Sequence, residues 1–239
     1  MKQKLVVLTG AGMSADSGLK TFRDANGLWE GHDVMSVASP RGFSQNPHLV
    51  LEFYNQRRRQ LLQAHPNAAH KALAKLQDYF EVSIITQNVD DLHERGGSRE
   101  VLHLHGELLK VRCTVDEQYI LEWKTDLNLG DKSKDGHQLR PHIVWFGEAV
   151  PLLPVAARLT SEADILLIIG TSMQVYPAAS LIDYCSPGIP IYFIDPIPSI
   201  ASQEYRNLKI IAEKAASGVP PLVEKLIRDA SRNSRDSLS

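Results

Sequence analysis

The stretch KLVVLTGAGMSA, residues 4–15, decides the fold class of this chain. Its first six residues form a short apolar run rich in β-branched side chains, which is typical of a strand buried on both faces of a parallel sheet. Gly10, Gly12 and Ala15 then fit the G-x-G-x-x-G/A pattern, in which glycines allow a tight turn and bring backbone N–H groups close to a pyrophosphate. The stretch predicts a dinucleotide-binding turn between a strand and a helix, and a similar turn without a ligand is the alternative.

Further apolar runs repeat this strand pattern along the chain, and segments with helical spacing separate them. The runs are residues 81–86, 164–170, 189–195 and 208–212, and the helical spacing occurs in residues 47–64, 67–80 and 219–230. Such alternation predicts an α/β fold with a doubly wound parallel sheet. Residues 112–140 interrupt it with polar, glycine-containing sequence and predict a small inserted lobe.

Length, composition and charge exclude several classes of protein. A chain of 239 residues with 43% hydrophobic residues can bury a substantial core. Its 26 Lys plus Arg and 28 Asp plus Glu give a net charge of -2, which disfavours a nucleic-acid partner bound through its phosphates. No apolar run has the length of a membrane span or of a signal segment. We therefore expect a soluble, cytoplasmic protein without nucleic-acid or membrane partners.

The region after the glycine turn departs from a classical dehydrogenase. Such an enzyme has a second strand that ends in an acidic residue about 20 positions after the turn. Residues 20–34 are instead polar and aromatic, without a strand pattern. An acidic residue at a strand end occurs later, at Asp195, where it could bind a ribose hydroxyl. The layout for hydride transfer is therefore disfavoured.

Polar residues follow two of the predicted strands, at the sheet edge where open α/β proteins bind ligands. They are Gln87, Asn88, Val89 and Asp90 after one run, and Gly170, Thr171 and Ser172 after another. Capping of the next helix by Asn88, Asp90 or Ser172 is the alternative use of these side chains.

His105 is the candidate general base. It lies in the sequence VLHLHG, directly before Gly106, and imidazole titrates near neutral pH. The chain has nine histidines, most of which must be structural or solvated, so packing is the alternative for any one of them. His103 lies two residues earlier on an expected strand and would point the opposite way.

Five motifs together resemble those of the sirtuins, the NAD-dependent protein lysine deacylases. In order they are GAGMSADSGLKTFRDANGLW, TQNVDDLH, LHLHG, PHIVWFGE and GTSMQVYPAA. The resemblance extends from Lys4 to about Leu222. It implies a single catalytic domain over residues 1–239, with a large Rossmann-type lobe, small-lobe insertions at about 25–65 and 106–147, and a cleft for NAD and an acyl-lysine peptide.

The activity that the resemblance implies is removal of acyl groups from protein lysines, with release of nicotinamide and O-acyl-ADP-ribose. An NAD glycohydrolase or ADP-ribosyl transferase is an alternative, because the same pocket activates the same glycosidic bond. A catalytically silent NAD or ADP-ribose sensing module is a third possibility.

The resemblance also assigns roles to residues. His105 is the base and Asn88 its catalytic companion at the nicotinamide ribose, where Gln87 also binds. Asp90 holds the carboxamide and Phe22 covers the ribose carbon. The NAD-binding set is Gly10, Ala11, Gly12, Ser14, Gly18, Phe22, Arg23, Gln87, Asn88, Val89, Asp90, Gly170, Thr171, Ser172, Asp195 and Ala215.

The polypeptide substrate is expected on the loop that contains Val144, Phe146, Gly147 and Glu148. By resemblance, this loop pairs with the peptide as with an added strand, so main-chain hydrogen bonds give affinity with little sequence preference. The apolar side chains of the loop could equally belong to the core of the small lobe.

Three residues indicate the acyl group. Tyr54 and Arg57 lie three apart on a predicted helix, hence on one face, and could hold a carboxylate. The pair resembles that of sirtuins which remove succinyl, malonyl or glutaryl groups, and Ala25 matches the small residue that leaves room for a longer chain. A solvated arginine beside a packed tyrosine is the alternative.

The cysteines depart from the family pattern. Most sirtuins hold a structural zinc with two C-x-x-C pairs, whereas this chain has Cys113 in that region and Cys185 elsewhere. One thiolate makes a poor zinc site, so we expect no zinc and no other metal. Packing must then hold the small lobe, and the candidates are Tyr119, Ile120, Leu121 and Trp123.

Overall fold

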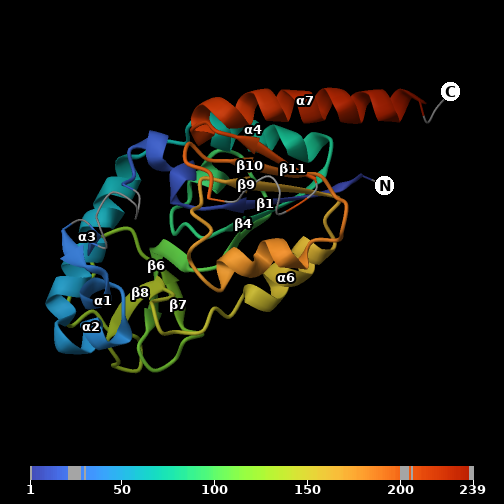
Figure 1. The fold of residues 1–239 in the computed structure, drawn as a ribbon. Helices are drawn as coiled ribbons and strands as arrows, with labels where there is room; N and C mark the ends of the chain where they lie inside the picture. Colours follow the sequence, from blue (N-terminus) through green and yellow to red (C-terminus); the bar gives the residue numbers. More distant parts are fainter. Residues whose placement is uncertain (1, 21–27, 30, 200–204, 206, 237–239) are drawn as a thin grey trace.

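The computed structural model describes residues 2–20, 28–29, 31–199, 205 and 207–236. Within these residues the large lobe is built on a six-stranded sheet with the order β11-β10-β9-β1-β4-β5, in which every neighbouring pair is parallel (Figure 1). The strands are β1 (Lys4–Thr9), β4 (Glu81–Thr86), β5 (Val101–His103), β9 (Ile165–Ile169), β10 (Ile191–Ile194) and β11 (Leu208–Ile211). The five predicted runs are thus confirmed as strands, and the α/β class is confirmed.

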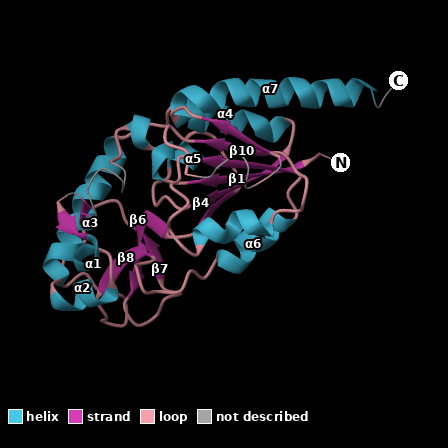
Figure 2. Ribbon diagram, in the orientation of Figure 1, coloured by secondary structure: helices cyan, strands magenta, loops and turns pink. Residues whose placement is uncertain are grey.

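Helices cover both faces of this sheet. On one face lie α4 (Ala68–Lys75) and α7 (Ala215–Asp236), and on the other α6 (Leu153–Ser161) and the 3-10 helix η5 (Ala178–Tyr184) (Figure 2). Side chains alternate along β1 between two apolar clusters, with Leu5 and Val7 in one and Val6 and Leu8 in the other. Both faces are therefore buried, which explains the continuous apolar runs in the sequence.

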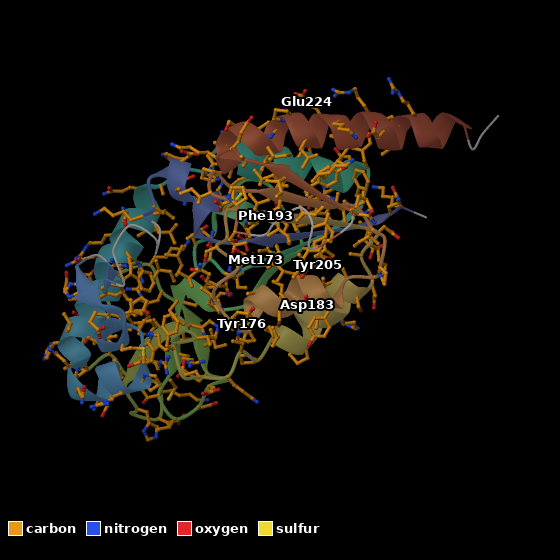
Figure 3. All side chains as sticks on the ribbon, viewed as in Figure 1. Met173, Tyr176, Asp183, Phe193, Tyr205 and Glu224 are labelled. Carbon is orange, nitrogen blue, oxygen red and sulfur yellow. The ribbon has the colours of Figure 1, made fainter. Side chains whose placement is uncertain are left out.

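A hydrogen bond helps to fix η5 on its face of the sheet. Tyr205 precedes β11, and its hydroxyl donates to Asp183 on η5 at 2.9 Å. Figure 3 shows the two side chains close together. Within the described residues no helix is long and apolar enough to cross a membrane.

The small lobe combines helices with an antiparallel sheet. Its elements are β2 (Leu28–Trp29), β3 (His32–Asp33), α1 (Val34–Val37), α2 (Pro40–Gln45), α3 (Pro47–Gln63), β6 (Gly106–Cys113), β7 (Ile120–Glu122) and β8 (Leu139–Ile143). The last three form a sheet with the order β7-β6-β8. Val50 and Phe53 of α3 share an apolar core with Leu108, Ile143 and Trp145, so the two parts of the lobe fold against each other.

Two of the four residues expected to pack in the small lobe do so, and two do not. Tyr119 and Trp123 do pack, partly buried, against a cluster of Leu51, Val111, Cys113, Leu127 and Leu139. Ile120 and Leu121 do not, because they are 42% and 36% exposed. They lie on β7, a three-residue strand at the edge of its sheet, and the whole strand is exposed.

Buried polar side chains add ties between α3 and the rest of the lobe. The Asn55 side chain donates to the Leu127 carbonyl at 3.0 Å and accepts from the Leu127 N–H at 2.8 Å. Arg58, which is 1% exposed, donates to Asn55 at 2.7 Å and to the Leu108 carbonyl at 3.2 Å. Buried polar groups are tolerated when bonded in this way, so one of three consecutive arginines is structural, not solvated.

The glycine turn differs in detail from the sequence expectation. The Gly10 N–H donates to Ile169 at 3.0 Å and the Gly12 N–H to Gly170 at 2.8 Å, so both are used within the protein. A Cβ on Gly12 would lie 2.8 Å from the Cα of Gly170, which is too close. Two 3-10 helices, η1 (Ala11–Met13) and η2 (Ala15–Ser17), follow in place of the expected α-helix. The glycines therefore allow the turn to pack directly against the backbone that follows β9.

Candidate active site

The site lies where the central strands end. The sheet order places β1 between β4 and β9. After β1 the chain adds β4 and β5 on one side of the sheet and then β9, β10 and β11 on the other, so the order of strand addition reverses between β1 and β9. Open α/β sheets bind ligands at such a switch point, outside the carboxyl ends of the strands. In Figure 1 this edge of the sheet faces the small lobe. The glycine turn, the segment after β4 and the segment after β9 all begin here.

Asn88, Ser14 and Asp90 form one buried hydrogen-bonded chain. The Asn88 amide donates to the Ser14 hydroxyl at 3.1 Å, and Ser14 donates to Asp90 at 2.9 Å. The other carboxyl oxygen of Asp90 accepts from the Leu92 N–H at 3.1 Å, at the start of α5 (Leu92–Arg95). Asp90 thus serves both as a cap and as a member of the site, and the structure brings together three predicted residues from two segments.

Burial sets the protonation of Asp90. Desolvation raises the pKa of its carboxyl to about 6, while the hydrogen bonds from Ser14 and Leu92 oppose the rise. The group is therefore poised to change charge close to neutral pH, which is common at functional sites.

His105 is arranged to accept a proton. It follows β5, is half-buried, and places Nδ1 3.1 Å from the backbone carbonyl of Gln87. A carbonyl can only accept, so Nδ1 carries the hydrogen and Nε2 keeps its lone pair. Burial lowers the pKa of His105, which keeps the imidazole neutral near pH 7. These are the properties of a general base.

The segment after β9 joins this cluster. The Gln87 amide donates to the Thr171 hydroxyl at 3.2 Å, and the same hydroxyl accepts from the Met173 N–H. Met173, labelled in Figure 3, has a φ of 52°, and Gly170 has a φ of 60°. Capping by Ser172 is excluded as the alternative, because the next helix, η5, begins at Ala178.

Two members of the predicted NAD set, Asp195 and Ala215, are buried within the protein. Asp195 directly follows β10, is 1% exposed and accepts from the Ile197 N–H at 2.9 Å. Ala215 begins α7 and packs in the apolar cluster that contains Met13 and Ile194. Their contacts with NAD stay predictions.

The described residues that remain from the predicted NAD set lie in two segments, after β1 and after β4. Ala11 is half-buried on η1, Gly18 directly follows η2 with a φ of 87°, and the Val89 carbonyl accepts from the Leu108 N–H at 2.8 Å. Phe22, Arg23 and Ala25 lie outside the described residues, so their predicted roles in NAD and acyl binding are not tested.

The loop that is predicted to bind the peptide is hydrogen-bonded to the backbone of His105. The Val144 N–H donates to the His105 carbonyl at 2.9 Å, and the Phe146 N–H donates to the Ala38 carbonyl at 2.9 Å. Phe146 is 41% exposed, and Gly147 has a φ of 90° with open space around it. The loop therefore presents an accessible surface beside His105.

Glu148 anchors this loop to the small lobe. Its carboxylate accepts from Arg140 at 2.6 Å, from Arg112 at 3.1 Å and from the Trp145 N–H at 2.7 Å. Burial opposes the charge, but the bonds from Arg140 and Trp145 outweigh it and lower the pKa of Glu148. The carboxylate thus holds the shape of the loop, and contact of this residue with a peptide stays a prediction.

Tyr54 and Arg57 lie on α3, as predicted, in different environments. Tyr54 is fully buried, and its hydroxyl accepts from the Trp145 indole N–H at 3.0 Å. Arg57 is half-buried, with its guanidinium 3.4 Å from the centre of the Phe53 ring and a 2.7 Å hydrogen bond to the Phe53 carbonyl. The arginine is therefore held in place as a cation on an aromatic face.

The described part of the chain contains no group of three or more His, Cys, Asp or Glu side chains placed to hold a metal ion. Cys113 is buried, with its sulfur 3.8 Å from the Ser133 hydroxyl. The expectation of a zinc-free lobe stays a prediction.

A buried series of hydrogen bonds beneath Asn88 was not predicted from the sequence. The Thr9 hydroxyl donates to Thr86 at 2.8 Å, lies 3.0 Å from His93 Nε2, and Thr86 accepts from the Asn88 N–H at 3.0 Å. A signal was present, because adjacent strands that both end in threonine can pair these residues in register, as Thr9 and Thr86 do here. These hydrogen bonds fix the backbone at Asn88, next to the other predicted site residues.

The fold and the site define a class of protein. A parallel sheet with ligand-binding groups at its switch point, a poised carboxyl and a neutral imidazole facing a second lobe is typical of a nucleotide-dependent enzyme. The family follows from comparison: the Sir2 family model matches residues 10–177, and the chain belongs to that family.

Individual proteins extend the comparison over nearly the whole chain. A protein of Helicobacter pylori named NAD-dependent protein deacylase is 58% identical over 229 residues, covering 96% of this chain and 100% of the relative. The solved complex of a Sir2 homologue with NAD has a TM-score of 0.86 at 38% identity, covering 96% of this chain and 91% of its own. Sir2 bound to an acetylated peptide has a TM-score of 0.73 at 28% identity, covering 96% and 94%.

The raised pKa of Asp90 predicts a pH-dependent stability. Folding favours the neutral carboxyl, so this contribution to the free energy of unfolding is complete below about pH 4 and is lost as the pH rises through about 6. Asp90→Asn removes the titration. Relative to wild type, we expect the variant to gain roughly 2 to 3 kcal/mol between pH 4 and pH 7, at about 1.4 kcal/mol per pKa unit, in urea unfolding. Asp91→Asn controls for loss of a neighbouring carboxylate, and a difference from wild type that stays constant with pH would refute the assignment.

Proposed function

We propose that the chain removes acyl groups from the lysine side chains of proteins, with NAD as co-substrate, and that it acts on succinyl and malonyl groups as well as, or in preference to, acetyl groups. The observation that carries the proposal is the geometry of His105, whose Nε2 is left to accept a proton beside the Asn88, Ser14 and Asp90 chain. Membership of the Sir2 family and the deacylase relatives support the same activity.

The residues present fit NAD. Amides of Gln87 and Asn88 can bond ribose hydroxyls, and the buried carboxyl of Asp90 can bond a carboxamide. The crowded turn at the end of β1 keeps side chains away from the switch point, where the phosphates of a dinucleotide bind in this fold class. Bound at this site, NAD would supply a ribose carbon that can accept the acyl oxygen and nicotinamide as the leaving group.

His105 moves the proton in this reaction. Its Nε2 takes a proton from a ribose hydroxyl, and the ring becomes positively charged. The Nδ1–H stays bonded to the Gln87 carbonyl, which stabilises that charge and keeps the ring oriented. Asn88 orients the ribose, and Ser14 in turn orients Asn88. The half-buried setting limits access of water to the reacting atoms.

The acyl-lysine substrate lies between the lobes along the loop of Val144, Phe146, Gly147 and Glu148. Glu148 holds the shape of that loop, and Val144 joins it to His105, so a peptide paired with the loop delivers its lysine to the base. Acetylated peptide bound to a Sir2 protein of the same fold supports this class of partner.

The acyl preference rests on α3. Arg57 presents a guanidinium fixed over Phe53, and a fixed guanidinium suits bidentate bonds to a carboxylate. Tyr54 contributes a hydroxyl that already accepts from Trp145, so its own hydrogen is available to donate to a carboxylate. Because Tyr54 is fully buried, contact with an acyl carboxylate requires a shift of the side chains that cover it.

Replacement of the base tests the assigned mechanism. His105→Ala should lower kcat/KM for NAD-dependent acyl removal by roughly 10²- to 10⁴-fold, because a general base contributes about that factor. In wild type, the acidic limb of kcat/KM should lie below pH 6.5, since burial lowers the pKa of His105. His48→Ala, at an exposed position on α3, is the control. Turnover retained by the His105 variant would remove this residue from the mechanism.

Replacement of Arg57 tests the proposed preference for acidic acyl groups separately from the deacylase activity. With matched succinyl-lysine and acetyl-lysine peptides, Arg57→Ala should lower the succinyl to acetyl ratio of kcat/KM by roughly 10- to 100-fold, the value of a charge-assisted hydrogen bond. Arg59→Ala is the matched control, because Arg59 lies on the same helix but pairs with Glu52 and Asp126 at the surface. An unchanged ratio in the Arg57 variant would keep the deacylase assignment and discard the preference.

A further inference from the structure

His103, the first histidine of VLHLHG, has no part in the reaction described above. It ends β5 and is 8% exposed. Its Nδ1 lies 3.2 Å from the backbone carbonyl of Asn88, and its Nε2 lies 2.7 Å from a carboxylate oxygen of Glu94 on α5. Both partners are acceptors, and a ring nitrogen can donate to an acceptor only when it carries a hydrogen. Both nitrogens must therefore be protonated, which makes the ring an imidazolium.

We infer that His103 is a positioning residue for the deacylation, whose protonated ring, paired with Glu94, holds Asn88 in its working position, so that activity falls when the ring loses a proton. The inference rests on the proposed function, because it matters only if Asn88 orients the co-substrate. His103 acts through Asn88 and does not touch the reacting atoms.

Loss of either hydrogen creates a repulsion. If Nδ1 loses it, a lone pair faces the Asn88 carbonyl at 3.2 Å, and if Nε2 loses it, a lone pair faces Glu94 at 2.7 Å. At Nδ1 water cannot relieve the contact easily, because His103 and Asn88 are both 8% exposed and an unsatisfied buried acceptor is costly. At Nε2 the Glu94 side chain, which is 39% exposed, can turn to water, and the ring then loses the partner that fixes it. In either case the ring no longer holds the Asn88 carbonyl in place.

Movement of the Asn88 backbone reaches the site directly. The Asn88 N–H donates to Thr86 at 3.0 Å, and its side-chain amide donates to Ser14 at 3.1 Å. Three bonds, including that from His103, thus fix the backbone and side chain of one residue. Removal of one bond loosens the orientation of the amide that is proposed to hold the ribose.

The charges around His103 favour the protonated form. Burial lowers the pKa of the ring, but the hydrogen bond and charge of Glu94, together with the charge of Glu107 on β6, outweigh burial and raise it. The charge of Asp90, after β4, interacts favourably with His103 as well. His93 on α5 stays neutral, because burial keeps its pKa far below the ordinary value. Asp90, whose pKa is raised to about 6, loses its proton at lower pH than His103, whose pKa is raised above the ordinary histidine value. The loss of a proton on the alkaline side therefore belongs to His103.

The test combines a protonation measurement with pH profiles on the full chain. Nitrogen NMR of labelled histidine should show His103 with both ring nitrogens protonated at pH 7, and His105 neutral with its hydrogen on Nδ1. In wild type, kcat/KM for NAD should fall on the alkaline side as His103 deprotonates. Glu94→Gln should move this alkaline limb to lower pH, because the partner charge that raises the pKa of His103 is gone.

The variant His103→Gln should lack the alkaline limb, keep the acidic limb of His105, and raise KM for NAD about tenfold, a factor worth about 1.4 kcal/mol. His48→Gln, at the surface, is the matched control. A general loss of folded protein would lower kcat at every pH and leave both limbs in place. A neutral His103 at pH 7, or an alkaline limb unchanged in His103→Gln, would overturn the inference. Absence of acyl removal by wild type would refute the proposed function instead, and the nitrogen shifts report on His103 whatever the activity.

Discussion

The close approach of two backbone turns underlies the rest of the structure. The turn after β1 reaches the end of β9, with Gly12 bonded to Gly170, and an added Cβ on Gly170 would lie 2.3 Å from the Met13 nitrogen. The contact fixes where β1 and β9 end, and the switch point of the sheet lies between them. Residues that follow β1, β4 and β9 therefore converge at one edge, where the proposed chemistry takes place.

Buried hydrogen bonds then determine what each group at this edge can do. Gln87 leaves the Nε2 of His105 as an acceptor, and Ser14 joins Asn88 to Asp90. In a buried setting such bonds decide protonation and orientation together, because water cannot compensate for a missing partner. In the small lobe, Glu148 likewise accepts hydrogen bonds from two arginines, which hold the loop that is hydrogen-bonded to the His105 carbonyl.

Much of this arrangement could be predicted from the sequence, because strands buried on both faces appear as β-branched apolar runs and strand ends place Asn88 beside the switch point. Which side chains form hydrogen bonds with one another could not be predicted. The pairing of His103 with Glu94 and of Tyr54 with Trp145 depends on how separate elements pack. The exposure of Ile120 likewise follows from its place on an edge strand, which no local pattern encodes.

Acyl transfer that consumes NAD can be tested with a mass-spectrometric inventory of the products that the wild-type protein forms from a succinyl-lysine peptide and NAD. We expect nicotinamide, the free lysine peptide and O-succinyl-ADP-ribose in equal amounts, each dependent on both substrates. Free ADP-ribose and nicotinamide formed at the same rate without the acyl peptide would rule out acyl transfer as the activity, because the protein would then be an NAD glycohydrolase.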